Sequence, residues 1–222
     1  VTIAASTPAG VFYGIQTLRK ALPVQTNGAD VTLPAVTVAD EPRFGYRGMM
    51  LDCARHFFPL SFVKKFIDIL ALHNMNVFHW HLTEDQGWRL EIKSHPELTA
   101  KSSMRSGTVI GHNAMVDDSI PHGGFYTQQE AREIVEYARQ RHITVIPEID
   151  MPGHMLAALA AYPELGCTGG LDDFFSGYSI WHTYRPTREF IMQMRLALFL
   201  RYEIIGFSIA NFGMMVSAYL IM

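Results

Sequence analysis

The chain has 222 residues, of which 49% are hydrophobic and 12% aromatic, so it can build a sizeable core. Its net charge is −3 with both signs interspersed, which excludes the basic patch typical of a nucleic-acid-binding protein. Two cysteines, Cys53 and Cys167, are too few for a disulfide framework, and we expect Cys53 to be a buried thiol. No signal-peptide pattern is recognised, and the localisation stays unknown.

The first part of the chain predicts the end of a small α/β domain. Its first three residues are a short β-branched stretch, and a helix is predicted over residues 9–22, with Pro8 in its first turn and Pro23 at its end. Residues 23–45 are rich in Pro, Gly, Asn and Asp, which is typical of a linker or hairpin. We therefore assign residues 1–40 to the end of an accessory domain and a linker.

Three strands are predicted in the next part, residues 41–170, over residues 46–54, 76–82 and 143–149. The third strand is almost continuously apolar, as expected for a strand buried on both faces. Because helical segments alternate with these strands, we predict a parallel sheet. Polar residues recur at the C-terminal ends of the strands, where a β/α barrel keeps its active site.

Two helices are predicted between these strands. The first can be capped by Ser61 and can end at Asn74 in the left-handed conformation. Its predicted apolar face consists of Phe62, Phe66, Ile69 and Leu70. The second follows a long polar segment, residues 94–126, and opens with a capping box from Thr127 to Glu130. Its predicted inward face consists of Ala131, Ile134, Val135 and Ala138.

The last segment, residues 171–222, shows no such alternation of strands and helices. Residues 204–222 contain no charged side chain and are close to the length needed to span a bilayer. Asn211, two serines and two glycines lower the apolarity of this stretch. We expect any membrane contact to be made by residues 204–222 alone.

The second predicted strand carries a pair of histidines. Strand parity places His79 and His81 on one face of this strand and Trp80 on the other. Such a pair could hold a metal ion, as in barrel hydrolases, or form a hydrogen-bonded pair that lines a polar pocket. Glu84 and Asp85 follow the strand and are either solvated surface or part of a site.

An arginine closes the first predicted strand. The donors of Arg55 suit sugar hydroxyls or a carboxylate, and the structural alternative is an ion pair with Asp52 or Asp150. At the end of the third strand, Glu148 and Asp150 precede His154, and Gly153 can supply a tight turn. A histidine beside carboxylates suits a general base or a charge-tuned binder.

Four long motifs carry a resemblance to a known family. They are residues 46–57 (YRGMMLDCARHF), 78–89 (FHWHLTEDQGWR), 123–127 (GGFYT) and 147–154 (PEIDMPGH). In this order they resemble the first half of the catalytic barrel of the β-N-acetylhexosaminidases, glycoside hydrolase family 20. Residues 10–18 (GVFYGIQTL) resemble the end of the α/β domain that precedes that barrel. The resemblance implies about the first three βα units of a (β/α)8 TIM barrel.

The resemblance also implies an activity, the removal of terminal β-linked N-acetylglucosamine or N-acetylgalactosamine with retention. In the family the acetamido oxygen of the substrate attacks the anomeric carbon, one of the exceptions to the two-carboxylate scheme. An Asp orients this acetamide, and the adjacent Glu protonates the leaving oxygen. The implied partners are glycans or glycoconjugates that end in N-acetylhexosamine, with no nucleic acid, metal or organic cofactor. Members are usually secreted, periplasmic or lysosomal.

The motifs carry the family's site residues over to this chain. Arg55 matches the arginine that grips ring hydroxyls, and His154 matches a histidine that supports the acid together with Glu84 or Asp85. We expect further substrate contacts from the other polar and aromatic motif residues, namely His79, Trp88, Glu148 and Asp150.

One motif of the family is not found. The family's catalytic Asp-Glu pair follows two glycines at a later strand, whereas the only Asp-Glu pair here is Asp40-Glu41, in the predicted linker. Three strand–helix units also cannot close a barrel of eight, and we expect the apolar segment 171–222 to match no part of the family. We therefore expect the 222-residue chain to be inactive alone. Two alternatives are a non-catalytic sugar-binding module that uses Arg55 and His154, and a metal-dependent barrel hydrolase that uses His79 and His81.

Overall fold

The computed structural model describes residues 1–23, 28, 30–111, 116–151 and 153–165, together with the backbone of three short strands after residue 206. Most of the segment that shows no strand–helix alternation therefore lies outside the described residues, and so does Cys167.

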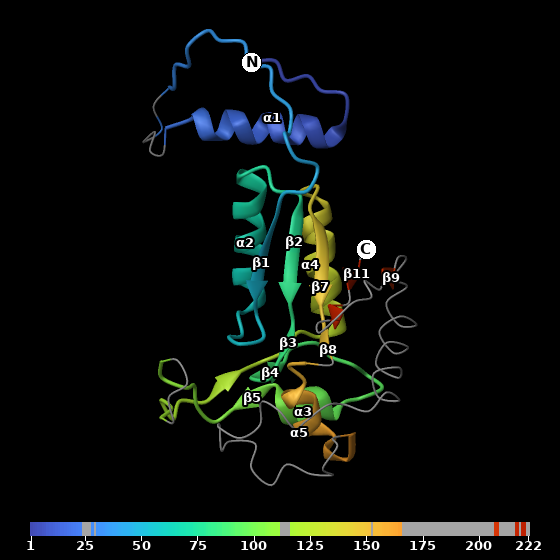
Figure 1. Cartoon of the computed structure of the whole chain (residues 1–222). Coiled ribbons are helices and arrows are strands. Elements are labelled where there is room, and N and C mark those ends of the chain that lie inside the picture. The colour runs from blue at the N-terminus through green and yellow to red at the C-terminus, as the bar shows by residue number, and fades with distance from the viewer. Residues whose placement is uncertain are drawn as a thin grey trace.

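A three-stranded parallel sheet forms the centre of the described structure, in the order β1-β2-β7 (Figure 1). Its strands are β1 (Gly48–Asp52), β2 (Val77–His81) and β7 (Thr144–Glu148). Asp52 is in register with His81, and His81 is in register with Glu148. The last residues of the three strands therefore form one polar row across the end of the sheet, and the predicted parallel sheet is confirmed.

The helices α2 (Leu60–Leu72) and α4 (Gln128–Arg139) flank the sheet (Figure 1). The α4 helix begins with the predicted capping box, in which the Thr127 hydroxyl accepts from the Glu130 amide and the Glu130 carboxylate accepts from the Thr127 amide. The order β1-α2-β2, followed by α4 and β7, is the arrangement of the first three units of a β/α barrel.

The buried face of α2 differs from the predicted one. The helix begins after Pro59, and no side chain caps it, so the prediction that Ser61 is its cap is wrong. Phe62 and Ile69, predicted to face inward, are 40% and 46% exposed. The helix is apolar on several sides, so helical spacing fits more than one face, and contact with the sheet selects one of them. The buried residues are Val63, Ile67, Leu70 and Ala71.

The helix α1 (Pro8–Ala21) lies across the end of the sheet at which the strands begin (Figure 1). Its first turn is capped by Thr7, whose hydroxyl accepts from the Gly10 amide at 3.1 Å. The first three residues form no strand, because no described strand lies beside them to pair with. Asn74, just after α2, has a φ of 58°, as predicted for a left-handed helix end.

Short elements gather at the opposite end of the sheet, where the strands finish (Figure 1). They are β3 (Thr83–Glu84), β4 (Gly87–Trp88), α3 (Glu97–Ser102), β5 (Met104–Arg105), β6 (His122–Gly123), β8 (Asp150–Met151), α5 (Leu156–Ala161) and the 3-10 helix η1 (Pro163–Leu165). Part of the polar segment 94–126 is thus ordered into α3, β5 and β6. The antiparallel pair β5–β6 joins Met104 and Arg105 to Gly123 and His122, and so brings two distant parts of this segment together.

Three strands lie in the last part of the chain, β9 (Phe207–Ser208), β10 (Val216–Ser217) and β11 (Tyr219–Leu220). The β10 strand pairs antiparallel with β8, and β11 pairs antiparallel with β9. Within the described residues, no helix is both long and apolar enough to cross a membrane. A membrane contact by residues 204–222 stays a prediction, since most of that segment lies outside the described part.

The hydrophobic core lies between the sheet, its helices and the β3–β4 hairpin. Cys53 is fully buried, as predicted, and accepts a hydrogen bond at 3.3 Å from the indole nitrogen of Trp80. Burial raises the pKa of the Cys53 thiol to about 11, which keeps it protonated and unreactive at neutral pH. Cys53 is therefore a core residue, although it lies two positions before Arg55.

Candidate active site

A tight turn after β1 displays Arg55. The Oδ1 atom of Asp52 accepts hydrogen bonds from the backbone amides of Ala54 at 3.0 Å and Arg55 at 2.9 Å, while Oδ2 pairs with the guanidinium at 2.6 Å. Aspartate commonly fixes a turn in this way. Burial raises the pKa of Asp52, but the hydrogen bonds from Arg55 outweigh it and leave the pKa lowered. Of the two ion pairs named as the structural alternative for Arg55, the one with Asp52 is present.

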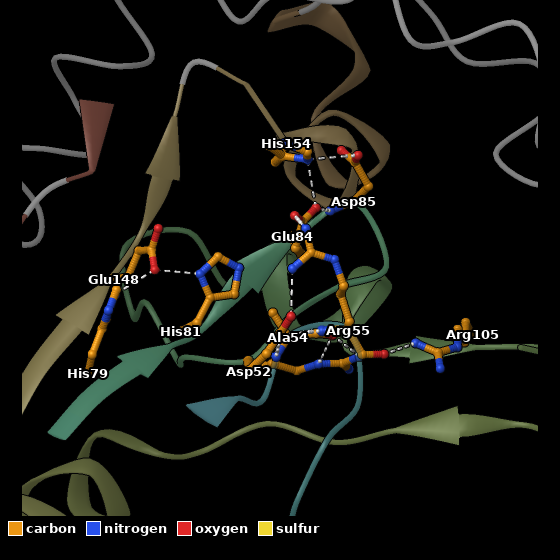
Figure 2. A network of polar contacts seen from close by, with 11 residues as sticks. Asp52, Ala54, Arg55, His79, His81, Glu84, Asp85, Arg105, Glu148 and His154 are labelled. Atoms are coloured by element: carbon orange, nitrogen blue, oxygen red, sulfur yellow. Dashed lines mark hydrogen bonds and ion pairs between the residues drawn. The ribbon is translucent and has the colours of Figure 1, made fainter. Parts of the chain in front are cut away.

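The same guanidinium reaches Glu84, on the β3–β4 hairpin that follows β2 (Figure 2). The Oε1 atom of Glu84 accepts from Arg55, and its Oε2 atom accepts from the Asp85 amide at 2.7 Å. The Glu84 side chain is 1% exposed, and burial raises its pKa, which the hydrogen bond from Asp85 only partly offsets. Glu84 is thus a buried carboxylate that a half-exposed arginine neutralises.

His154 comes from the turn after β8 and lies against two carboxylates (Figure 2). Its Nδ1 atom is 3.0 Å from Oε2 of Glu84 and 3.3 Å from Oδ2 of Asp85. Asp85 also accepts from the Leu156 amide at 3.2 Å, so it ties the histidine to the start of α5. Burial lowers the pKa of His154, but the charges of Glu84 and Asp85 outweigh it and raise the pKa above its usual value.

The backbone conformation of this turn corrects the sequence-based expectation. We expected Gly153 to supply the unusual conformation, but the residue with a positive φ is His154 itself, at 54°. A positive φ is sterically unfavourable for a non-glycine residue. Such a residue retains this conformation only where its surroundings fix the side chain. The two carboxylates that bind the imidazole supply that constraint, because they fix where the ring lies.

A second cluster lies beside the first and joins β2 to β7 (Figure 2). The Oε2 atom of Glu148 is 2.6 Å from Nε2 of His79 and 2.6 Å from Nδ1 of His81. The histidines thus share one face of β2, as predicted. Burial raises the pKa of Glu148, but the two histidines outweigh it and hold the pKa far below its usual range. Burial lowers the pKa of His81, and Glu148 more than reverses that.

The three polar residues at the end of the third predicted strand, Glu148, Asp150 and His154, divide between the two clusters. The β7 strand ends at Glu148, whereas Asp150 belongs to the separate strand β8. Asp150 is buried, its amide donates to the Thr83 hydroxyl at 2.9 Å, and burial raises its pKa. Glu148 therefore joins the histidine pair, and Asp150 lies with Glu84 and His154.

The side chains that could hold a metal ion form a different group from the predicted histidine pair. In the described part of the chain, the grouping whose ligand atoms all lie within 4.8 Å of one another consists of Glu84, Asp150 and His154. The pair His79 and His81 lies outside this grouping and binds Glu148. The guanidinium of Arg55 already provides the positive charge beside Glu84, and a cation there would compete with it.

Trp88, a predicted substrate contact, lies in the core. Its side chain is buried, with the residue 1% exposed, and its indole nitrogen donates to the carbonyl of Leu90 at 2.7 Å. No face of the ring is left for a sugar in this structure. A tryptophan next to a polar motif serves a core as readily as a ligand, and the motif alone does not distinguish the two uses.

Two arginines that sequence reasoning did not select lie behind the Arg55 turn. Arg89 and Arg105 donate to the backbone carbonyls of Ala54 and Arg55, respectively. Arg89 stands at the end of a recognised motif, which was a usable signal, whereas Arg105 lies in the polar segment and has no distinguishing pattern. The arrangement as a whole presents a guanidinium and a carboxylate-bound imidazole at one end of the sheet, a combination suited to a hydroxyl-rich ligand.

Two family models match the chain. The catalytic domain of glycosyl hydrolase family 20 matches residues 44–196, and domain 2 of the same family matches residues 1–41. The first match continues past residue 154, where the last recognised motif ends, and past residue 170, where the predicted barrel segment ends.

Curated relatives named beta-hexosaminidase are similar to most of this chain. The protein from Porphyromonas gingivalis is 50% identical over 172 residues, which cover 75% of this chain and 21% of that protein. The protein from Vibrio furnissii is 48% identical over 164 residues, which cover 74% of this chain and 26% of that protein. The chain therefore spans only these fractions of the relatives' lengths.

Solved structures support the same fold. A structure described as a beta-N-acetylhexosaminidase superposes with a TM-score of 0.75 at 39% identity, covering 88% of this chain and 40% of the other. The GH20 beta-N-acetylhexosaminidase from Streptomyces coelicolor A3(2) gives a TM-score of 0.69 at 39% identity, covering 84% of this chain and 37% of the other.

Proposed function

The chain belongs to glycosyl hydrolase family 20, and we propose that it is part of an exo-acting β-N-acetylhexosaminidase that removes terminal N-acetylglucosamine or N-acetylgalactosamine. The observation that carries the proposal is the position of Glu84, which bridges Arg55 and His154. These residues come from three separate strand ends, and the family motifs contain all of them. We retain the domain boundaries near residues 40 and 170 as part of this proposal.

The proposed role of Arg55 is to hold ring hydroxyls of the terminal sugar. Asp52 and Glu84 each bond one terminal nitrogen of the guanidinium, and the side chain is 47% exposed. The guanidinium has five N–H donors, so donors remain for a hydroxyl-bearing ligand. Because two carboxylates hold Arg55 in place, little conformational entropy is lost when a sugar binds.

The proposed role of His154 is to support a general acid by its charge. Its raised pKa favours the imidazolium, and its Nδ1 atom faces Glu84 and Asp85. In the family mechanism the substrate's acetamido oxygen attacks the anomeric carbon while an acid protonates the leaving oxygen. A histidine tied to two carboxylates can adjust the charge around that acid without touching the sugar.

We further propose that the 222-residue chain does not turn over substrate alone. The sequence contains no Gly-Gly-Asp-Glu motif, so neither the acetamide-orienting Asp nor the acid is identified in it. Loss of a general acid alone typically lowers the rate by about 10²–10⁴. A second candidate, a sugar-binding module without turnover, is favoured by the same observation, because Arg55 and His154 are in place.

Two measurements test these proposals. The purified 222-residue chain is assayed with a chromogenic β-N-acetylglucosaminide, and we expect no turnover above background. Turnover that is lost in Glu84→Gln contradicts the proposed inactivity. Binding of N-acetylglucosamine, followed by NMR, is then compared between the wild type, Arg55→Ala and the exposed control Arg139→Ala. Binding that only Arg55→Ala abolishes supports the sugar-binding role, and binding that Arg55→Ala leaves unchanged contradicts it.

The hydrolase itself is tested in a chimera. Residues 1–165 of this chain are joined to the corresponding remainder of the Porphyromonas gingivalis relative, which supplies the later part of the barrel. We expect the chimera to hydrolyse the chromogenic substrate. A chimera that folds but cleaves no N-acetylhexosaminide contradicts the proposed function.

A further inference from the structure

Arg89 is a fully buried arginine that binds only backbone carbonyls in the described structure. Its Nε and Nη2 atoms donate to the Ala54 carbonyl at 3.1 and 2.8 Å. Nη1 donates to the carbonyls of Ser103 and Gly124, and Nη2 also donates to Gln86. One guanidinium thus ties together the Arg55 turn, the β3–β4 hairpin and both ends of the β5–β6 segment.

The charge of Arg89 is costly to keep in this place. The residue is 0% exposed, and no carboxylate forms an ion pair with it in the described part of the chain. Burial lowers the pKa of Arg89 to about 10, and the nearby Arg105 adds to the effect. A buried charge without a counter-ion is destabilising unless hydrogen bonds satisfy its donors. Here backbone carbonyls from four segments satisfy them.

Arg105 binds the next carbonyl along the same turn. Its Nη1 atom donates to the carbonyl of Arg55 at 2.6 Å (Figure 2), while Nε and Nη2 donate to the Thr108 hydroxyl at 3.2 and 2.9 Å. Two arginines therefore hold two consecutive carbonyls of the turn, those of Ala54 and Arg55. On the other side of the turn, Asp52 holds the two consecutive amides of the same residues.

We propose that Arg89 and Arg105 are positioning residues, which fix the backbone of the Arg55 turn and thereby hold the Arg55 guanidinium against Glu84. The proposal rests on the proposed function only for the role of Arg55 as a sugar ligand. Arg55 itself is half exposed, and its side chain has many rotamers, so its direction depends on where its backbone is fixed. Without the two arginines, consecutive carbonyls lose their donors and the turn can rotate.

The test measures the pKa of His154 by NMR titration of the 222-residue chain without substrate. His154 lies against Glu84, and Glu84 pairs with Arg55, so displacement of Arg55 changes the charge that His154 feels. The benchmark is the shift of the His154 pKa in Arg55→Ala. The variants are Arg89→Lys, Arg105→Gln and each of them combined with Arg55→Ala. Arg139→Lys, on the exposed face of α4, is the control, and thermal melting verifies that each variant is folded.

We expect Arg89→Lys and Arg105→Gln to shift the pKa of His154 in the same direction as Arg55→Ala, and the double variants to match Arg55→Ala alone. Such non-additivity is the signature of residues that act through Arg55. If the single variants leave the pKa unchanged, or if the double variants shift it further, the arginines act elsewhere and the proposal is wrong.

Two further outcomes are also decisive. If Arg55→Ala itself produces no shift, Arg55 is not coupled to His154 through Glu84, and the proposal fails. If Arg89→Lys does not fold, Arg105→Gln decides alone, because the hydrogen bonds that it removes are those with the Arg55 carbonyl and the Thr108 hydroxyl. No sugar is present in this test, so its result is independent of whether the chimera hydrolyses a hexosaminide.

Discussion

The Oε2 atom of Glu84 lies 3.0 Å from Nδ1 of His154, and this contact joins the hairpin after β2 to the turn after β8. It sets the charge of the site, because a buried carboxylate and a strained histidine neutralise one another there. Arg55 pairs with the other carboxylate oxygen of Glu84, Oε1. The site therefore depends on the register of β1, β2 and β7, which brings the ends of these strands together.

In the chimera, Arg55→Ala and His154→Ala should have different kinetic effects. Contacts with ring hydroxyls persist through the reaction, so Arg55→Ala should raise KM and lower kcat/KM. His154 acts through the acid, so His154→Ala should mainly lower kcat. Steady-state kinetics with a chromogenic β-N-acetylglucosaminide measures both. If thermal melting shows that neither variant is folded, the two residues are structural and the assignment is wrong.

Glu148→Gln should destabilise the chain, because it removes the charge that His79 and His81 share. Breaking a buried charged network by removing one partner costs about 3–5 kcal/mol, and the amide retains part of the hydrogen bonding. We therefore expect a loss of about 2–4 kcal/mol in the free energy of unfolding, measured by urea denaturation.

The control for Glu148→Gln is Glu136→Gln. Glu136 is exposed on α4, where it pairs with Arg139 at 2.7 Å. Surface substitutions usually change stability by no more than about 0.5 kcal/mol. Equal effects of the two substitutions contradict a special role for the Glu148 cluster.

The pH dependence of stability should have opposite signs for two histidines. The pKa of His154 is raised in the folded chain, so its contribution is present below pH 6.5 and is lost as the pH rises through the folded pKa. The pKa of His122 is lowered, chiefly by burial and then by Arg105. Its contribution is present above pH 6.5 and is lost as the pH falls through the folded pKa.

Urea denaturation of the wild type, His154→Gln and His122→Gln from about pH 5 to pH 9 tests this pair of signs. The stability difference between the wild type and each variant isolates one histidine from the other titrating groups. His122 accepts from the Phe57 amide at 3.0 Å, which requires a neutral ring nitrogen and explains its sign. Differences that do not vary with pH, or that vary in the same direction, contradict the assignment.

The parts of this structure that the sequence predicts are those that depend on local pattern. Strand parity placed His79 and His81 on one face, and the capping box located the start of α4, because both follow from the spacing of neighbouring residues. The motifs also placed Arg55, Glu84 and His154 at strand ends. Since the strands of a parallel sheet end at the same edge, the predicted sheet already implies that these three residues lie close together.

The parts that were not predicted depend on contacts between distant segments. The buried face of α2 is selected by the sheet, since helical spacing fits more than one face. Arg89 and Arg105 bind backbone carbonyls, which carry no sequence signal. Trp88 turned inward because the β3–β4 hairpin folds onto the core, where Trp88 pairs with Thr83. In each case the outcome depends on contacts between segments that are far apart in the sequence, and the local pattern does not determine these contacts.

Gly87→Ala should destabilise the chain and disturb the Arg89 contacts. A Cβ atom at Gly87 would lie 2.3 Å from both Cζ and Nη2 of Arg89. The guanidinium cannot move away freely, since it is fully buried and binds the carbonyl of Ala54. Overpacking of a buried region typically costs about 1–3 kcal/mol, and we expect a loss of that size in urea denaturation.

The matched control is Gly45→Ala, because an added Cβ at Gly45 meets no atom within 4 Å. Neither glycine has a positive φ, so the comparison isolates crowding from backbone strain. If crowding of Arg89 is the cause, Arg89→Lys should reduce the penalty of Gly87→Ala, since the lysine side chain lacks the planar group that the new methyl meets. Equal losses in Gly87→Ala and Gly45→Ala, or a penalty that Arg89→Lys leaves unchanged, contradict the requirement for glycine beside the guanidinium.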